Sequence, residues 1–481
     1  MLRVLATGVA VTATATLLAS CSTVVQGSAV SVYADPFKVA GMQAVDGPTG
    51  LRSGISLDAR DVEESDGGKI DQIAAQSVSD IEEYWDAAFS EAFPGAFKPV
   101  SALVSWDSNG YAENFCGDFT AGLVNAAFCP VDNTIGWDRG ELFPALRRAH
   151  GDMAITMVLA HEYGHSVQKQ ARLNKRNVST LVAEQQADCF SGAYMRWVAE
   201  DNSDRFTLST GDGLNNLLVS MISFRDPLLT EEDRSFGAGE DEHGTAFERI
   251  SAFQFGFTDG PSACASIDAK EVAQRRGDLP VALAGGETGE WAVSEESVRA
   301  FVDAMNAKFS PENPPTLTFD GDRASACQDA RPSPPVSYCP STNTLAVDLP
   351  GLQEMGSPRD GDDPSAMLSG DNSAYSVLMS RYVLALQNER GLELDSAEAG
   401  LRTACLTGVA TTMLTARVNT PAGNTIALTA GDVDEAVAGL LINGLAASDV
   451  NGETVPAGFS RIDAFRTGVL GDQERCLRRF P

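Results

Sequence analysis

Apolar residues recur at three- and four-residue steps along several stretches of this 481-residue chain, which is the periodicity of an amphipathic helix. The pattern predicts helices over 70–93, 151–170, 181–194 and 294–309. Short runs rich in apolar and β-branched residues predict strands within 99–106, 130–138 and 314–321. We therefore expect an α+β fold that is predominantly helical and contains a few short strands.

The second half of the chain repeats the order of the first. The segment CGDFTAGLVNAAFCPVDNTIGWD (116–138) is echoed by CQDARPSPPVSYCPSTNTLAVD (327–348), and FERISAFQFGFTDGPSAC (247–264) by FSRIDAFRTGVLGDQERC (459–476). Successive cysteines are 13, 60 and 75 residues apart in the first half and 12, 66 and 71 in the second. Because the chain is also too long for one hydrophobic core, we expect two homologous tandem domains. They cover 71–268 and 292–481, and 269–291 is the linker.

The N-terminal residues MLRVLATGVAVTATATLLASC are typical of a secretory signal, with an early arginine and a short apolar run. Leu18 to Cys21 resemble a bacterial lipobox, so residues 1–21 are interpreted as a lipoprotein signal peptide and Cys21 as the lipidated residue. The alternative is an ordinary cleaved signal with an incidental cysteine. Residues 22–70, rich in Gly, Ser and Asp, are expected to form a flexible tether.

Eight further cysteines are an even number, which in an exported chain favours disulfide bonds. Eight cysteines allow 105 pairings, but the duplication predicts that each half closes on itself. The expected bonds are Cys116–Cys129, Cys189–Cys264, Cys327–Cys339 and Cys405–Cys476.

The net charge of the chain argues against two classes of binding partner. The chain has 66 acidic and 35 basic residues and a net charge of −31, which argues against direct binding of nucleic acid or of an anionic membrane surface. Contact with the membrane is expected through the N-terminal lipid alone.

The stretch VLAHEYGHSVQKQ (158–170) carries the strongest chemical signal, with two of the chain's four histidines. His161 and His165 are four residues apart, so on a helix both imidazoles project from one face and can share a metal ion. Glu162 lies one step round the helix, where it can reach a water on that metal. Gly164 would let another element approach closely.

A zinc site needs a third protein ligand and an open position. The following helical pattern, LVAEQQADCFSGAY (181–194), offers Glu184, 19 residues after His165. Asp188 follows four residues later on the same face and could accept a hydrogen bond from a ligand imidazole. The alternative for Asp188 is a surface or capping carboxylate.

The blocks HEYGHSVQ, EQQADCFSGAY and HGTAFERISAFQFGFTDG resemble those of the bacterial putative neutral zinc metallopeptidase family. The resemblance covers the first domain and implies a zincin-like helical core with a gluzincin ligand set. By that resemblance, His161, His165 and Glu184 hold one Zn²⁺ and Glu162 is the general base, which takes a proton from the attacking water and passes it to the leaving amine. His243 is the candidate donor to the oxyanion, or else a surface histidine in an acidic loop. The third block departs from the family pattern around Phe247 and Glu248, so no role is carried over to Arg249.

The second copy lacks this chemistry. Alignment on the shared tyrosine and glutamine pairs VLAHEYGHSVQ with VLMSRYVLALQ (377–387). Ser380, Arg381 and Leu384 then replace His161, Glu162 and His165, while Gly400 and Ala404 replace Glu184 and Asp188. We expect one zinc ion per chain, in the first domain only, and a degenerate second domain that could bind a protein partner.

Together these features predict a zinc metallopeptidase that is exported, anchored to the outer face of the cell membrane as a lipoprotein, and acts on peptides or proteins. The competing hypothesis is a non-catalytic binding or assembly lipoprotein whose zinc site is structural or vestigial. A zinc hydrolase for another substrate is less favoured, because no phosphate or sugar motif occurs.

Overall fold

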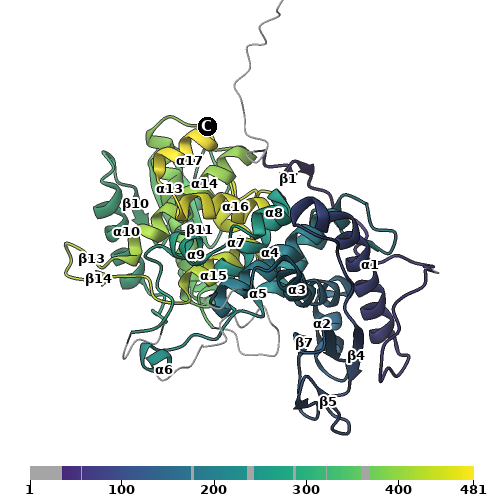
Figure 1. Ribbon diagram of the computed structural model, residues 1–481. Helices are drawn as coiled ribbons and strands as arrows, with labels where there is room; N and C mark the ends of the chain where they lie inside the picture. The colour runs from purple at the N-terminus through teal and green to yellow at the C-terminus, as the bar shows by residue number, and fades with distance from the viewer. Residues whose placement is uncertain are drawn as a thin grey trace, which may run out of the picture.

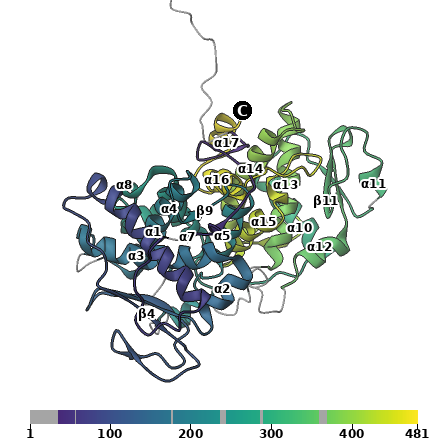
Figure 2. The same ribbon diagram turned by 90° about the vertical axis from the view of Figure 1, so that its right-hand side faces the viewer.

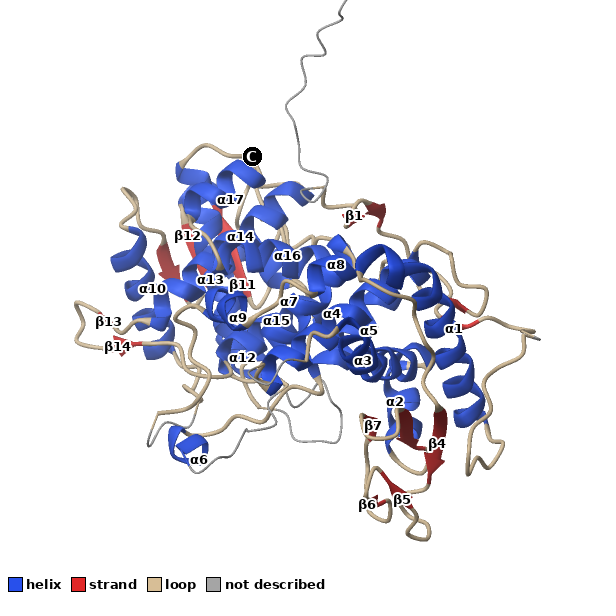
Figure 3. Ribbon diagram, viewed as in Figure 1, coloured by secondary structure: helices blue, strands red, loops and turns tan. Residues whose placement is uncertain are grey.

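The computed structural model describes residues 35–481, apart from 56, 175–177, 236–242, 285–288, 321 and 359–368. The described residues form an α+β structure in which helices predominate, as predicted (Figure 3). The helix predicted over 70–93 is observed at Lys69–Ala92, and the one predicted over 151–170 at Asp152–Ala171.

The first half contains nine helices and nine strands among its described residues. The helices are α1 (Lys69–Ala92), α2 (Leu142–His150), α3 (Asp152–Ala171), α4 (Thr180–Ala199), α5 (Asp212–Ile222), α6 (Glu231–Ser235), α7 (Ala246–Asp259), α8 (Pro261–Cys264) and α9 (Ala269–Arg276). The strands are β1 (Lys38–Val39), β2 (Met42–Gln43), β3 (Gly50–Leu51), β4 (Ala102–Trp106), β5 (Asn114–Phe115), β6 (Asp118–Phe119), β7 (Ala126–Cys129), β8 (Thr134–Asp138) and β9 (Phe206–Thr207).

The second half repeats much of this order. Its helices are α10 (Glu295–Phe309), α11 (Asp322–Ser325), α12 (Leu349–Met355), α13 (Asp371–Glu389), α14 (Ala397–Thr415), α15 (Asp432–Ile442), α16 (Gly458–Val469) and α17 (Gln473–Arg479). Its strands are β10 (Thr316–Thr318), β11 (Val336–Cys339), β12 (Thr344–Val347), β13 (Val418–Asn419) and β14 (Thr425–Ile426).

Each half has one three-stranded sheet of the same topology. The order is β4-β8-β7 in the first half and β10-β12-β11 in the second. Strand β4 is parallel to the central strand β8 and β7 is antiparallel to it, and β10 and β11 pair with the central strand β12 in the same way. The registers match as well, because Cys129 lies opposite Thr134 and Cys339 opposite Thr344.

The two halves lie side by side and share one hydrophobic core. Figures 1 and 2 show the purple-to-teal half beside the green-to-yellow half, with the two sheets far apart. Helices α5 and α7 contact α15 and α16, and one cluster of buried apolar side chains extends through both halves. The division into two domains at 71–268 and 292–481 stays a prediction, since the halves are not separated by a break in the core.

In both halves, the closest helix crossing depends on a pair of glycines. A Cβ atom on Gly192 of α4 would lie 2.1 Å from the carbonyl oxygen of Phe253, and one on Gly256 of α7 would lie 1.7 Å from that of Cys189. The second half repeats these contacts with Gly408 and Gly468, at 2.2 Å and 1.8 Å from Phe465 and Cys405. A backbone oxygen cannot rotate away as a side chain can, so only glycine permits these approaches.

The variant Gly256→Ala is therefore expected to lower the free energy of unfolding by about 3 kcal/mol, the upper end of the usual cost of overpacking. Gly439→Ala in α15 is the matched control, because a Cβ atom there meets nothing within 4 Å. Removing a helical glycine should leave that variant as stable as the wild type or up to about 1 kcal/mol more stable. Chemical denaturation of both variants measures the difference, and equal stabilities would contradict the role of the crossing.

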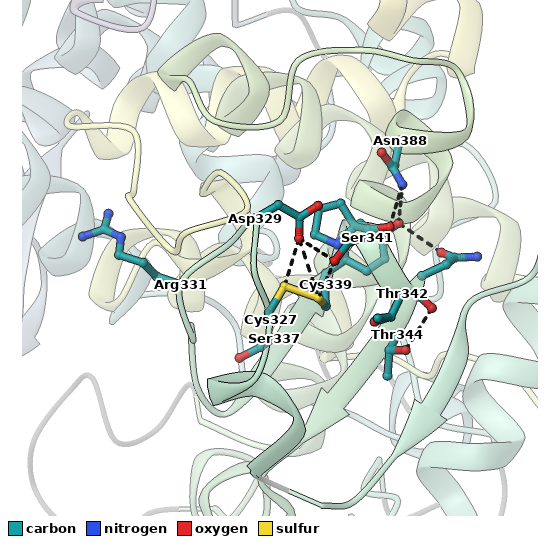
Figure 4. The surroundings of a disulfide bond; sticks show 12 residues. Cys327, Asp329, Arg331, Ser337, Cys339, Ser341, Thr342, Thr344 and Asn388 are labelled. Atoms are coloured by element: carbon teal, nitrogen blue, oxygen red, sulfur yellow. Dashed lines mark hydrogen bonds between the residues drawn. A yellow bond between two sulfur atoms is a disulfide. The ribbon is translucent and has the colours of Figure 1, made fainter.

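All four predicted disulfides are confirmed. Cys116–Cys129, Cys189–Cys264, Cys327–Cys339 and Cys405–Cys476 are bonded in the structure. Figure 4 shows Cys327–Cys339 at the end of β11, where Asp329 accepts a hydrogen bond of 2.9 Å from Ser341. Cys189–Cys264 joins α4 to α8, and Cys405–Cys476 joins α14 to α17. In each half the bond therefore links the first helix of the glycine crossing to the short helix that follows the second one.

The expectation of a flexible tether over 22–70 is wrong for the described residues 35–68. Strand β3 pairs with β9, the amide of Asp212 donates to Asp46 at 2.8 Å, and Ser460 of the second half donates to the carbonyl of Lys38 at 2.7 Å. These partners lie far along the chain and hold the described part of this segment against both halves. The predicted signal peptide and Cys21 lie outside the described residues. No helix in the described part of the chain has both the length and the apolar character needed to cross a membrane.

Candidate metal centre

Helices α3 and α4 together carry the predicted ligands. Gly164 allows their close contact, because a Cβ atom at this position would lie 2.9 Å from the Cα atom of Ala187. The hydroxyl of Ser179 caps α4 by accepting from the amide of Val182. These local features fix the start and the position of α4, and thereby where Glu184 lies.

The structure brings His161, His165 and Glu184 together. One possible ligand atom from each lies within 4.8 Å of the others. Nε2 of His161 is 3.0 Å from Oε2 of Glu184, and Nε2 of His165 is 3.4 Å from Oε1. Two imidazole nitrogens and one carboxylate are a common donor set for catalytic zinc, so these residues fit the ion that the sequence predicts.

Each histidine is oriented by a second partner. Nδ1 of His161 lies 2.7 Å from Oδ1 of Asp188, and Nδ1 of His165 lies 3.1 Å from Oε1 of Gln168. Both partners are oxygen acceptors, so each Nδ1 can donate its proton to them, which leaves each Nε2 to offer a lone pair to a bound metal ion. This is the arrangement that holds histidine ligands in proteins. Asp188 was predicted in this position, whereas Gln168 was not.

Carboxylates dominate the electrostatics of the centre. Burial lowers the pKa of His161, but the charges of Asp188 and Glu184 raise it, with a net result of about 10. Burial likewise raises the pKa of Glu184, and hydrogen bonds from the two histidines bring it well below its usual value. The centre therefore attracts positive charge, which is the condition for holding a divalent cation.

Glu162 lies beside the ligands without joining them. Its Oε2 accepts a hydrogen bond of 2.9 Å from the amide of Phe128 in β7. A pocket of about 210 Å³ opens here, and Glu162 and His161 form part of its wall. The apolar part of the wall consists of Val124, Ala126, Leu142, Met157, Val158, Met221 and Phe224.

His243 also lies beside the centre. Its Nε2 is 3.6 Å from Oε2 of Glu184, and its Nδ1 is 3.5 Å from Oδ1 of Asp226. Its side chain is 47% exposed and lines the same pocket. The structure thus places His243 in the site. His150, the fourth histidine of the chain, is buried at the end of α2 beside Asn216.

Arg249 is the main site residue that sequence reasoning missed. Its Nε and Nη2 donate to both oxygens of Asp188, at 2.9 Å and 2.8 Å, and its Nη1 donates to the carbonyl of Phe224. The ion pair between Arg249 and Asp188 is buried. Asp188 in turn contacts Nδ1 of His161, so the three side chains form a continuous chain of contacts. The only signal in the sequence was its place in the third block, 61 residues from Asp188, which gives no partner.

The equivalent place in the second half is occupied by a buried arginine. Ser380, Arg381 and Leu384 of α13 are all fully buried. Nε of Arg381 donates to the carbonyl of Val336 in β11 at 3.0 Å, as Glu162 contacts β7, and its Nη1 donates to Ser448 at 2.8 Å. Burial lowers the pKa of Arg381 to about 10, so this side chain remains positively charged at neutral pH.

A family model described as putative neutral zinc metallopeptidase matches residues 21–267, just over half of the chain. The chain belongs to this family. The matched region includes all of the residues of the candidate centre and ends before the second half begins.

Two bacterial proteins are similar in sequence to the first half of the chain. Uncharacterized protein YpfJ of Escherichia coli K12 is 28% identical over 249 residues, which cover 47% of this chain and 82% of the relative. Uncharacterized protein Rv2575 of Mycobacterium tuberculosis is 26% identical over 207 residues, which cover 39% and 68%. No solved structure matches the chain significantly. The zinc metallopeptidase family thus accounts for the first half, and the relatives add no named activity.

Proposed function

We propose that the chain is a zinc-dependent peptidase that hydrolyses peptide bonds with Glu162 as its general base. The observation that carries this proposal is the convergence of His161, His165 and Glu184 next to a glutamate on the wall of a pocket. Membership of the zinc metallopeptidase family supports the same chemistry. Zinc quantification, together with degradation of a peptide library by the wild type and by Glu162→Gln, tests it.

The residues of the chain have distinct tasks in this reaction. Zinc, when bound, supplies a Lewis acid that lowers the pKa of water to about 7 and polarises a carbonyl group. The carboxylate of Glu162 takes a proton from the attacking water and gives it to the departing amine. The hydrogen bond from Phe128 occupies Oε2 of Glu162, which leaves Oε1 available to take the proton.

His243 is the candidate donor to the oxyanion that develops on the substrate carbonyl. The variant His243→Ala is expected to lower kcat about 10²-fold with little change in zinc content, as for the loss of one preorganised donor. Steady-state kinetics on a cleaved peptide, with metal analysis of the same samples, measures both quantities. His150→Ala is the control histidine, because His150 lies outside the pocket. An unchanged kcat for His243→Ala would show that this histidine only lines the entrance.

We also propose that residues 292–481 are a degenerate copy of the peptidase domain, so that each chain holds one zinc ion. The repeated sheet topology, disulfides and glycine contacts support common descent. The second half also contacts the third block directly, because Asp434 of α15 accepts a 3.0 Å hydrogen bond from the amide of Phe247 at the start of α7. Helix α7 carries Arg249, so the second half supports the element that holds Asp188.

The proposed location is the outer face of the cell membrane, with a lipid on Cys21. The support is the N-terminal sequence, in which an apolar run ends at a cysteine. Membrane fractionation of cells that produce Cys21→Ala tests the anchor separately from catalysis.

A further inference from the structure

The outer strands β4 and β10 hold equivalent places in the two sheets. Each is parallel to the central strand of its sheet, and the registers agree, because Ala102 lies opposite Thr134 and Thr316 opposite Thr344. Counting along the strands from these pairs makes Leu317 equivalent to Leu103, Thr318 to Val104 and Phe319 to Ser105. The two outer edges can therefore be compared residue by residue.

The first half covers the outer edge of β4 with a segment of its own. The amide of Glu63 donates to the carbonyl of Leu103 at 2.8 Å, and the amide of Ser105 donates to the carbonyl of Glu63 at 3.0 Å. The equivalent groups of β10 are the carbonyl of Leu317 and the amide of Phe319. Neither of them forms a backbone hydrogen bond to any described residue. Strand β10 thus presents an unpaired edge to which another extended segment can add.

The two sheets also differ on the face opposite the main core. In the first half this face is covered by the buried rings of Trp106 and Phe115, whose centroids lie 5.1 Å apart. A Cβ atom on Gly136 of β8 would lie 2.6 Å from the ring of Phe115, so nothing else fits there. Phe115 belongs to β5, in the long connection from β4 to β7. The second half connects β10 to β11 through α11 and leaves a pocket of about 320 Å³ on the same face.

Hydroxyl groups and two arginines give this pocket its chemistry. The hydroxyl groups come from Thr316, Thr318, Ser337, Thr342 and Thr344. Figure 4 shows part of this wall beside the disulfide Cys327–Cys339. Arg323 and Arg331 also line the pocket, and no aspartate or glutamate does among the described residues, although the chain has a net charge of −31. Arg331 pairs with Glu453 at 2.7 Å, whereas Arg323 lies 3.9 Å from Asp320 and is 71% exposed. The pocket therefore suits a carboxylate.

We propose that the second half binds an extended acidic segment of another protein, which adds a strand to the outer edge of β10 and places a carboxylate in the pocket. Paired residues of a sheet project from the same face, so the side chain of a residue opposite Thr318 lies on the pocket face. In the first half the residue at this position is a glutamate, Glu63, opposite Val104. Main-chain hydrogen bonds supply affinity in this kind of recognition, and side-chain pockets supply specificity.

A synthetic peptide of residues 60–66, RDVEESD, with blocked ends and a fluorophore, is the probe, because this segment carries the residue that pairs with β4. Fluorescence anisotropy with the zinc-loaded full chain should show saturable binding of one peptide per chain. Hydrogen–deuterium exchange should slow in residues 316–323 and stay unchanged in residues 102–106. The Glu162→Gln variant should bind the peptide with the same affinity, which separates this proposal from the peptidase proposal.

Modified peptides test the two parts of the contact separately. A peptide methylated on the amide nitrogen of Glu63 cannot donate to the carbonyl of Leu317 and should bind at least about fivefold more weakly, the effect of one net hydrogen bond. A peptide with Glu63→Gln lacks the carboxylate and should bind about three- to fivefold more weakly. Equal affinity of the methylated peptide would overturn strand addition. Complete displacement of the peptide by an equal concentration of free glutamate would show a small-anion site only, and would also overturn it.

Variants of the chain locate the site. Arg323→Gln should weaken binding about three- to fivefold, whereas Arg478→Gln, whose side chain is 70% exposed, is the matched control and should leave binding unchanged. Phe319→Pro removes the outward amide and leaves the pairing with β12 intact, as proline permits on an edge strand, and it should weaken binding about fivefold. If that variant does not fold, the methylated peptide still tests the edge. The unliganded chain should sediment as a monomer, and a dimer that the peptide dissociates would assign the edge to a second copy. That result, or the absence of saturable binding, would overturn the proposal.

Discussion

The variant Glu162→Gln is expected to bind zinc as the wild type does and to hydrolyse peptides about 10⁴-fold more slowly, the upper range for loss of a general base. An amide has nearly the same shape as a carboxylate, and its oxygen can still accept the hydrogen bond from Phe128. It cannot take a proton from water at neutral pH. The fold and the metal ligands should therefore survive while proton transfer fails. Single-turnover rates on a fluorogenic peptide, with zinc measured in the same preparation, check both statements.

Two other variants serve as controls for Glu162→Gln. Glu91→Gln removes an exposed carboxylate on α1, outside the pocket, and should leave the rate unchanged. His161→Ala removes a ligand and should lose both zinc and activity. If Glu162→Gln kept the wild-type rate with zinc bound, Glu162 would not be the base. If the zinc-loaded wild type cleaved no peptide in a broad library, the binding or assembly hypothesis would replace the enzymatic one.

The sequence predicted the features that depend on local spacing. A separation of four residues on a helix fixed the relation of His161 to His165, and the returning helix brought Glu184 within 3.0 Å of His161. The disulfides followed in part from the duplication, because similar cysteine spacing in the two halves indicates that each half closes on itself, which leaves three pairings for the four cysteines of a half. Helix positions followed from periodicity, with α1 displaced by a single residue from its predicted bounds, whereas α4 continues to Ala199, five residues past its predicted end.

Contacts between distant segments could not be predicted from these patterns. The pairing of β3 with β9 joins residues more than 150 positions apart, and polar, glycine-rich sequence gives no sign of it. Likewise, Asp434 binds the amide of Phe247 from 187 residues away. Such contacts depend on how the helices pack, and neither composition nor periodicity specifies a partner. The role of Arg249 could not be predicted for the same reason, because its positive charge does not indicate which carboxylate it pairs with.

Arg249 links the third block to the metal ligands through one buried acid. Asp188 is fully buried, and burial raises its pKa, but Arg249 and His161 lower it to about 2. The carboxylate therefore stays ionised and can accept the proton of His161 Nδ1, 2.7 Å away. An ionised Asp188 holds the imidazole so that Nε2 faces the site. Arg249 is thus a positioning residue, because it acts on the ligand through Asp188.

The variant Arg249→Met is expected to lower the free energy of unfolding by about 3–5 kcal/mol, since it leaves a buried carboxylate without its basic partner. Zinc affinity should fall about 10–100-fold, the usual effect of disturbing the partner of a histidine ligand. Arg478→Met is the control, because Arg478 is 70% exposed and lies 4.0 Å from Glu474, so its loss should cost less than about 1 kcal/mol and leave zinc binding intact. Denaturation in zinc-free buffer and competition with a zinc chelator measure the two effects separately. A purely structural arginine would lower stability and leave the affinity of the folded protein for zinc unchanged, which would contradict the path from Arg249 through Asp188 to His161.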